Sequence, residues 1–280
     1  MESLVSTDWL AGELGAADLK VVDATLFLPG SGRDARVEHE AGHIPGAVFM
    51  DLDAVADPAS ALPHGWPPSH VFASRMRTLG LGDGDRIVVY DNSPLHSAAR
   101  AWWMLRSFGA KKVAILDGGL GQWQAEGRPL EGGAALARGG HFTPSAADGA
   151  IVDKAFVAAL IGSSEVEIVD ARPGSRFRGE EGEPRPGVAP GHIPGSKNLP
   201  QSELFEADGT FKRGEALRGA FERAGVDLAR PMVTTCGSGV TACVLLFGAH
   251  LLGKEDMRLY DGSWSEWGAD PSAPRAMGTA

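Results

Sequence analysis

The sequence is poor in cysteine, with only Cys236 and Cys243 among its 280 residues. Two cysteines cannot build a disulfide framework, so stability has to come from a packed core, and each cysteine becomes a candidate for chemistry instead. Hydrophobic residues make up 43% of the chain and charged residues 22%, which is the composition of an ordinary globular protein with such a core.

Long hydrophobic runs and clusters of positive charge are also missing. No apolar stretch approaches the ~20 residues of a membrane-crossing helix, which excludes a membrane span. Residues 1–14 lack the basic and apolar regions of a signal peptide, so we expect a cytoplasmic protein. The net charge of −10 without a Lys/Arg cluster argues against nucleic acid as a partner.

The chain instead contains one series of landmarks twice, in the same order. Gly-His-Ile-Pro-Gly stands at residues 42–46 and again at 191–195. In the first copy an apolar run ending in Asp precedes the motif at 21–23, and a second strand pattern, a helical stretch and an Asp-Gly pair follow it at 87–91, 98–108 and 117–118. In the second copy the matching segments stand at 168–170, 232–236, 241–252 and 261–262. Agreement across all these landmarks indicates a tandem repeat.

Short β-branched runs that alternate with helical segments predict an α/β fold, with two tandem domains that each hold a mostly parallel sheet flanked by helices. We expect a first domain over residues 1–132, a Gly-, Ala- and Ser-rich linker over 133–149, and a second domain over 150–280. The proline-rich loop at 57–69 has a length typical of functional loops. Because glycine and proline serve tight turns, we interpret His43 and His192 of the repeated motif as structural.

The segment that carries chemistry is Cys236-Gly-Ser-Gly-Val-Thr241, between a predicted strand and a predicted helix. A glycine-rich turn at this place directs successive main-chain N–H groups into one concavity, to which the helix N-terminus adds positive potential. Such a cradle stabilises a thiolate, the nucleophilic form of Cys236. Cys243 lies within an apolar helical stretch and is interpreted as a core residue.

Cysteine phosphatases use a comparable cradle, but they place an arginine six positions after the cysteine. Ala242 stands there, so the planar cation that grips phosphate is missing. The first copy has Asp91 at the position of Cys236. A carboxylate cannot replace the thiol of Cys236, so we expect the first domain to be catalytically silent.

The tandem arrangement, the two Gly-His-Ile-Pro-Gly motifs and the Cys-Gly-Ser-Gly-Val-Thr loop together resemble the 3-mercaptopyruvate sulfurtransferases, a tandem-domain group of the rhodanese family. The resemblance covers nearly the whole chain, including the closing residues 261–267. Thiosulfate sulfurtransferases of the same family carry basic residues after the cysteine. Gly237 and Ser238 stand there in this chain and match the mercaptopyruvate group.

The resemblance also implies roles for further residues. Arg176 and Arg185 match arginines that bind the carboxylate and ketone oxygens of the donor. Ser238, His64 and Asp53 match a Ser–His–Asp arrangement, although the sequence around His64 departs from the family pattern and His70 is a competitor.

The reaction that the resemblance implies moves sulfur from 3-mercaptopyruvate through a Cys236 persulfide to cyanide or a thiol acceptor, possible acceptors including thioredoxin, and releases pyruvate. The main-chain N–H groups of Gly237, Gly239, Val240 and Thr241 would hold the persulfide. No cofactor and no metal is expected. The alternatives are a thiosulfate sulfurtransferase and a rhodanese-like binding module without catalysis; the presence of Cys236 argues against the latter.

Overall fold

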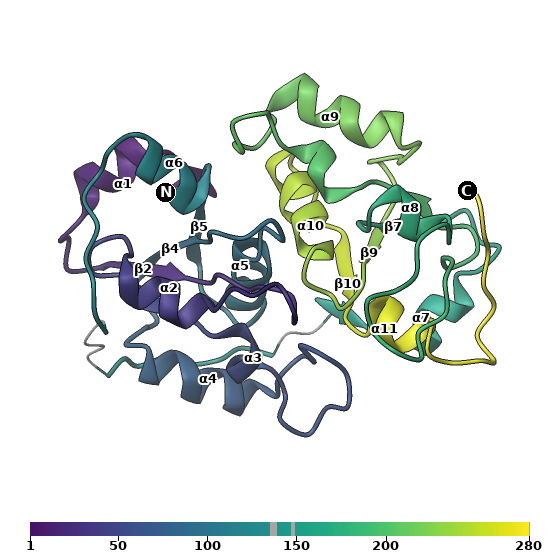
Figure 1. Ribbon diagram of the computed structural model, residues 1–280, viewed down its shortest axis with the longest axis horizontal. Helices are drawn as coiled ribbons and strands as arrows, with labels where there is room; N and C mark the ends of the chain where they lie inside the picture. Colours follow the sequence, from purple (N-terminus) through teal and green to yellow (C-terminus); the bar gives the residue numbers. More distant parts are fainter. Residues whose placement is uncertain (135–138, 147–148, 280) are drawn as a thin grey trace. The chain divides into compact units, whose positions relative to one another are not determined.

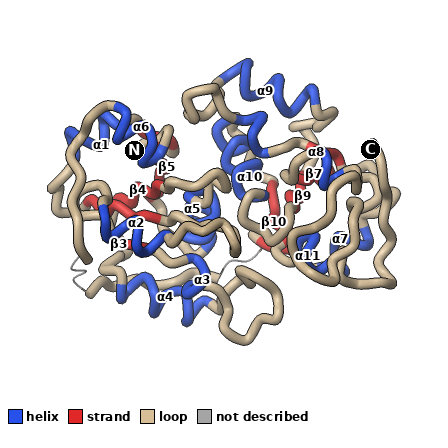
Figure 2. Tube along the Cα trace, viewed as in Figure 1, coloured by secondary structure: helices blue, strands red, loops and turns tan. Residues whose placement is uncertain are grey.

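The computed structural model describes residues 1–134, 139–146 and 149–279. The chain folds into two compact units, each with strands at its centre and helices around them (Figures 1 and 2). Among the described residues, the first unit holds those of 1–58, 66–147 and 206–210, and the second holds those of 59–65, 148–205 and 211–280. Each unit therefore includes a short segment from the other half of the sequence.

The described residues of the first unit form a five-stranded sheet in the order β1-β5-β4-β2-β3, and every neighbouring pair is parallel. The strands are β1 (Leu4–Val5), β2 (Leu19–Asp23), β3 (Val48–Phe49), β4 (Arg86–Tyr90) and β5 (Lys112–Leu116). The helices are α1 (Thr7–Glu13), α2 (Ala35–Ala41), α3 (Leu52–Val55), α4 (Ser69–Thr78), α5 (Ala98–Ser107) and α6 (Gly119–Ala125).

The second unit repeats this architecture with a five-stranded parallel sheet in the order β6-β10-β9-β7-β8, again counted over the described residues. Its strands are β6 (Ile151–Val152), β7 (Glu167–Asp170), β8 (Lys197–Asn198), β9 (Met232–Thr235) and β10 (Met257–Tyr260). Its helices are α7 (Lys154–Ala159), α8 (Gly174–Phe177), η1 (Gln201–Leu204), α9 (Gly214–Arg223), α10 (Ala242–Leu251) and α11 (Ser263–Trp267), of which η1 is a 3₁₀ helix. The prediction of two α/β domains with parallel sheets is confirmed.

Both faces of each sheet are buried, which explains the nearly continuous apolar runs of the strands. In the first unit, Leu10 of α1 and Trp123 of α6 pack with Val21 and Val88 on one face, while α5 contacts β4 and β5. In the second unit, the tryptophans of α11 pack with Val233, while α10 contacts β9 and β10. Residues 242–249 of α10 are all buried, so this helix is apolar on every side.

The functional end of the second sheet follows from its topology. The chain runs from β7 outward to β8 and then returns to β9 on the opposite side of β7. The order of strands therefore reverses between β7 and β9, and open parallel sheets bind ligands at the carboxyl ends of strands at such a point. Cys236 directly follows β9 at this end.

The repeated Gly-His-Ile-Pro-Gly motif has the same structural role in both units. His43 Nδ1 donates to the carbonyl of His39 at 2.7 Å, and His192 Nδ1 donates to the carbonyl of Phe177 at 2.9 Å. Both histidines are 1% exposed, and each forms an isolated bridge to a later segment of the chain, at Glu131 and Ala276. The motif thus anchors a turn in the core.

The predicted linker lies partly outside the described residues. Of the segment 133–149, residues 139–146 belong to the first unit, where Phe142 is 1% exposed and packs against Phe72. Over residues 1–134, 139–146 and 149–279, no helix combines the length and apolar character that crossing a bilayer demands.

Candidate active site in the second unit

The Cys236 loop, residues 236–241, joins β9 to the N-terminus of α10. Gly239 has a φ of 77°, a left-handed conformation that suits glycine and turns the loop toward the helix. Within the described part of the chain, the main-chain N–H groups of Gly237, Ser238, Val240 and Thr241 donate to no other protein group. They are therefore available to an anion at the start of the helix.

The segment at the start of α11 holds the Cys236 loop from the side. Ser263 Oγ accepts the N–H of Cys236 at 3.1 Å and donates to the Tyr260 carbonyl at 2.8 Å. The N–H of Trp264 donates to the Cys236 carbonyl at 2.9 Å, and that of Ser265 donates to the Gly237 carbonyl at 2.8 Å. These bonds fix the main chain on both sides of the thiol.

Cys236 is 2% exposed, although a nucleophilic thiol has to be reached by its donor. Hydrogen bonds from the α11 segment hold its main chain in this position. Its surroundings are nevertheless polar, because Gly237 and Thr241 are partly exposed and a guanidinium lies beside the loop.

Of the two predicted donor-binding arginines, Arg176 lies beside the Cys236 loop, and Arg185 is connected to it through Ser265. Arg176, in α8, places Nη2 3.3 Å from the position that a Cβ at Gly237 would occupy. Arg185 places Nη1 3.4 Å from Ser265 Oγ, and the same hydroxyl donates to the Gly237 carbonyl at 2.5 Å. Arg178 instead pairs with Glu180 at an exposed position. The loop therefore has guanidinium groups on its Gly237 side, where a carboxylate could be held.

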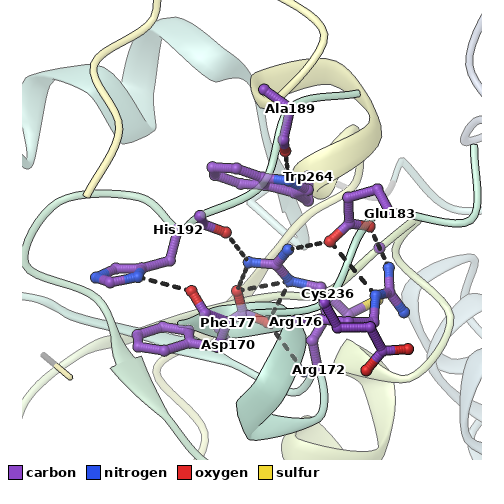
Figure 3. A network of polar contacts seen from close by, with 12 residues as sticks. Asp170, Arg172, Arg176, Phe177, Glu183, Ala189, His192, Cys236 and Trp264 are labelled. Atoms are coloured by element: carbon purple, nitrogen blue, oxygen red, sulfur yellow. Dashed lines mark hydrogen bonds and ion pairs between the residues drawn. The ribbon is translucent and has the colours of Figure 1, made fainter. Parts of the chain in front are cut away.

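A buried ionic network supports Arg176 (Figure 3). Glu183, whose side chain is 3% exposed, pairs with Arg176 on one side and with Arg172 Nη1 at 2.7 Å on the other. Arg172 also pairs with Asp170 at 2.7 Å and lies over the ring of Trp264. Burial opposes the charge of Arg172, but the two carboxylates raise its pKa above the ordinary value, so it remains a cation.

The structure brings two members of the predicted Ser–His–Asp arrangement together. His64 belongs to the segment 59–65 of the second unit, and its Nδ1 lies 3.0 Å from Ser238 Oγ, although the two residues are 174 positions apart. His64 has a φ of 57°, a left-handed conformation that costs about 1–3 kcal/mol for such a residue and is often found at functional sites. Asp53 is an exposed residue of α3 in the first unit, and His70 is an exposed residue of α4.

The corresponding loop of the first unit is filled by its own side chain. Asp91 Oδ1 accepts the N–H of Ser93 at 2.9 Å, and Oδ2 accepts the N–H of Ala98 at 2.8 Å. Loss of solvent raises the pKa of Asp91 to about 7, although these two hydrogen bonds act in the opposite direction. A carboxylate thus occupies the place that an external anion would take in the second unit.

Sequence reasoning missed three residues of this site. Arg172 and Glu183 form the ionic network, and Ser263 binds the main chain of Cys236. One signal for Ser263 was available: the first copy has Gly119 at the matching position, so the second copy has gained a hydroxyl there. The spacing of Glu183 between the two arginines gave no comparable signal.

The arrangement can bind an anion beside a sulfur nucleophile. Amide donors at a helix start, guanidinium groups and a thiol converge there, and a hydroxyl–imidazole pair supplies a route for a proton. In the described ranges, no group of three or more His, Cys, Asp or Glu side chains is placed to bind a metal ion.

Comparison with known proteins identifies the family of this chain. The rhodanese-like domain model matches twice, over residues 6–126 and 153–270. The 3-mercaptopyruvate sulfurtransferase of Escherichia coli strain K12 is 43% identical over 96% of this chain and 96% of its own length. The human 3-mercaptopyruvate sulfurtransferase is 43% identical over 95% of this chain and 91% of its own.

A solved structure gives the same result for the fold. The crystal structure of SseA from Escherichia coli, described as a 3-mercaptopyruvate sulfotransferase with the rhodanese fold, superposes with a TM-score of 0.86 at 41% identity. The superposition covers 95% of this chain and 100% of the SseA chain. The chain therefore belongs to the rhodanese family, and within it to the tandem-domain group of enzymes that contains the 3-mercaptopyruvate sulfurtransferases.

Proposed function

We propose that this enzyme takes sulfur from 3-mercaptopyruvate as a persulfide on Cys236, releases pyruvate, and passes the sulfur to cyanide or a thiol. The observation that carries the proposal is the placement of Cys236 directly after β9, in the loop that leads to the start of α10 and has Arg176 beside its Gly237. The relatives named above point to the same donor through their names.

Donor binding is assigned to the two arginines. Arg176 and Arg185 hold the carboxylate and ketone oxygens, and a guanidinium is suited to this because it donates two parallel hydrogen bonds in a fixed geometry. The donor sulfur then faces Cys236. Proximity of this kind supplies a large part of the rate of a displacement reaction.

The first displacement forms the persulfide. The Cys236 thiolate attacks the donor sulfur, the carbon–sulfur bond breaks, and its electron pair stays on carbon as the enolate of pyruvate. The persulfide gives up its proton and the enolate takes one, so the pair formed by Ser238 and His64 is assigned to proton transfer, with Asp53 as its third member. The amides of Gly237, Gly239, Val240 and Thr241 stabilise the persulfide anion.

The second displacement regenerates the thiolate. A nucleophilic acceptor attacks the outer sulfur, the sulfur–sulfur bond breaks, and its electrons return to Cys236. Cyanide leaves as thiocyanate, and a thiol, whether small or carried by a protein such as thioredoxin, leaves as a persulfide. Because a covalent intermediate separates the two half-reactions, ping-pong kinetics are expected. The first unit carries no persulfide, since Asp91 stands at its nucleophile position.

Intact-mass measurement tests the proposal. Wild-type protein treated with 3-mercaptopyruvate should gain one sulfur atom and release an equal amount of pyruvate, and cyanide should remove the gain. Cys236→Ser should show neither change, with Cys243 present as an internal control thiol. A wild-type protein that gains no mass, or a Cys236→Ser variant that still turns over, would contradict it, and a higher kcat/KM for thiosulfate would reassign the donor.

A further inference from the structure

The ionic network beside the Cys236 loop has a charge balance of its own (Figure 3). It contains two carboxylates, Asp170 and Glu183, and two guanidinium groups, Arg172 and Arg176. Asp170 and Arg172 are each 1% exposed and pair with one another at 2.7 Å. Because the charge of Asp170 balances that of Arg172, the charge of Glu183 balances that of Arg176. The four groups together are therefore neutral.

The Arg176–Glu183 pair lies directly beside the Cys236 loop. Arg176 Nη2 lies 3.3 Å from the position of a Cβ at Gly237, and Glu183 contacts the same guanidinium through both carboxylate oxygens. Glu183 is 3% exposed, so solvent screens its charge weakly. The loop residues Gly237 and Ser238 bring no charge that would offset it.

We infer that Glu183 determines which donors this site accepts: its carboxylate cancels the charge of Arg176 and makes the site favour a donor with one negative charge over a donor with two. This inference rests on the proposed function. A second negative charge on the donor doubles its repulsion from Glu183 and its attraction to Arg176 alike, so a dianion gains little from this neutral pair while it loses more hydration than a monoanion does. Specificity of this kind depends on a repulsive group as much as on an attractive one.

The test compares two donors in Glu183→Gln. Glutamine keeps the size of the side chain and an oxygen for Arg172, but it removes the negative charge. The ratio of kcat/KM for thiosulfate, a dianion, to kcat/KM for 3-mercaptopyruvate, a monoanion, should rise about tenfold, which corresponds to about 1.4 kcal/mol. Both donors are measured at one fixed ionic strength.

Two matched variants separate charge from geometry. Glu180→Gln removes a charge from the same loop at an exposed residue that pairs with Arg178, and it should leave the donor ratio unchanged. Glu183→Asp keeps the charge and shortens its reach, so it should lower kcat/KM for both donors by similar factors. A ratio that stays constant in Glu183→Gln, or that rises equally in either other variant, would overturn the inference.

Inhibition of the wild-type enzyme provides a test that needs no variant. Sulfate and methanesulfonate have similar tetrahedral shapes but carry two charges and one charge. Methanesulfonate should compete with 3-mercaptopyruvate several-fold more strongly than sulfate does, and equal or stronger inhibition by sulfate would overturn the inference even if Glu183→Gln does not fold. Failure of the proposed function is recognised separately, because wild-type enzyme would then release no pyruvate from 3-mercaptopyruvate.

Discussion

Replacement of Ser263 offers a sharp test of how the nucleophile is held. This residue has a φ of 50° and is fully buried, and its hydroxyl accepts the N–H of Cys236. The left-handed conformation costs a residue with a Cβ roughly 1–2 kcal/mol relative to glycine. Removal of the hydroxyl leaves a buried N–H without its acceptor, at a cost of about 1–3 kcal/mol.

These magnitudes predict an inverted order of two variants. Ser263→Ala loses the hydroxyl and keeps the strained conformation, so it should be destabilised by about 2 kcal/mol. Ser263→Gly loses the same hydroxyl, but glycine adopts the left-handed conformation without strain. The strain energy that is removed is larger than the roughly 0.5–1 kcal/mol by which the greater entropy of glycine stabilises the unfolded chain. The glycine variant should therefore be the more stable of the two, by up to about 1 kcal/mol, although alanine is normally favoured.

The first unit provides the internal precedent, because Gly119 has a φ of 56° at the matching position. Urea unfolding followed by tryptophan fluorescence gives the free energies of unfolding of the wild type and both variants. Both variants should also lose kcat, since the main chain of Cys236 is no longer held in place. An alanine variant as stable as the glycine variant, or more stable, would refute the strain argument.

Two further predictions concern Asp91 and Arg185. The pKa of Asp91 is raised to about 7 in the folded state, so its carboxyl group favours folding at about pH 4 and this contribution is lost as the pH rises toward 7. The melting temperature of Asp91→Asn should therefore fall less between pH 4 and pH 7 than that of the wild type. An equal fall in the two proteins would count against the raised pKa of Asp91. Arg185→Gly should raise KM for 3-mercaptopyruvate at least tenfold, and more than it raises KM for thiosulfate. Steady-state kinetics with both donors measures this, and equal increases would exclude carboxylate docking at Arg185.

The repeated units and the Cys236 loop could be predicted because their signals are local. Apolar runs that end in Asp23 and Asp170 mark strands buried on both faces, and a glycine-rich turn before an apolar helix marks a cradle. The burial of Cys236 could not be predicted, because it depends on hydrogen bonds from residues 263–265.

The contacts within the site were out of reach for a related reason. The family resemblance named His64 and Ser238, but only the fold could place their side chains 3.0 Å apart. Glu183 looked like one acid among several in a charged loop. Its role arises from its burial between Arg172 and Arg176, which no spacing encodes.

The membership of residues 59–65 in the second unit has a consequence for the history and the engineering of the chain. A tandem duplication begins with two interchangeable copies, yet here the copy with the nucleophile takes an imidazole from the sequence of the other. Expression of residues 150–280 alone would therefore keep Cys236 and lose His64. A deletion or exchange of the first copy would therefore also change the residue that lies beside Ser238.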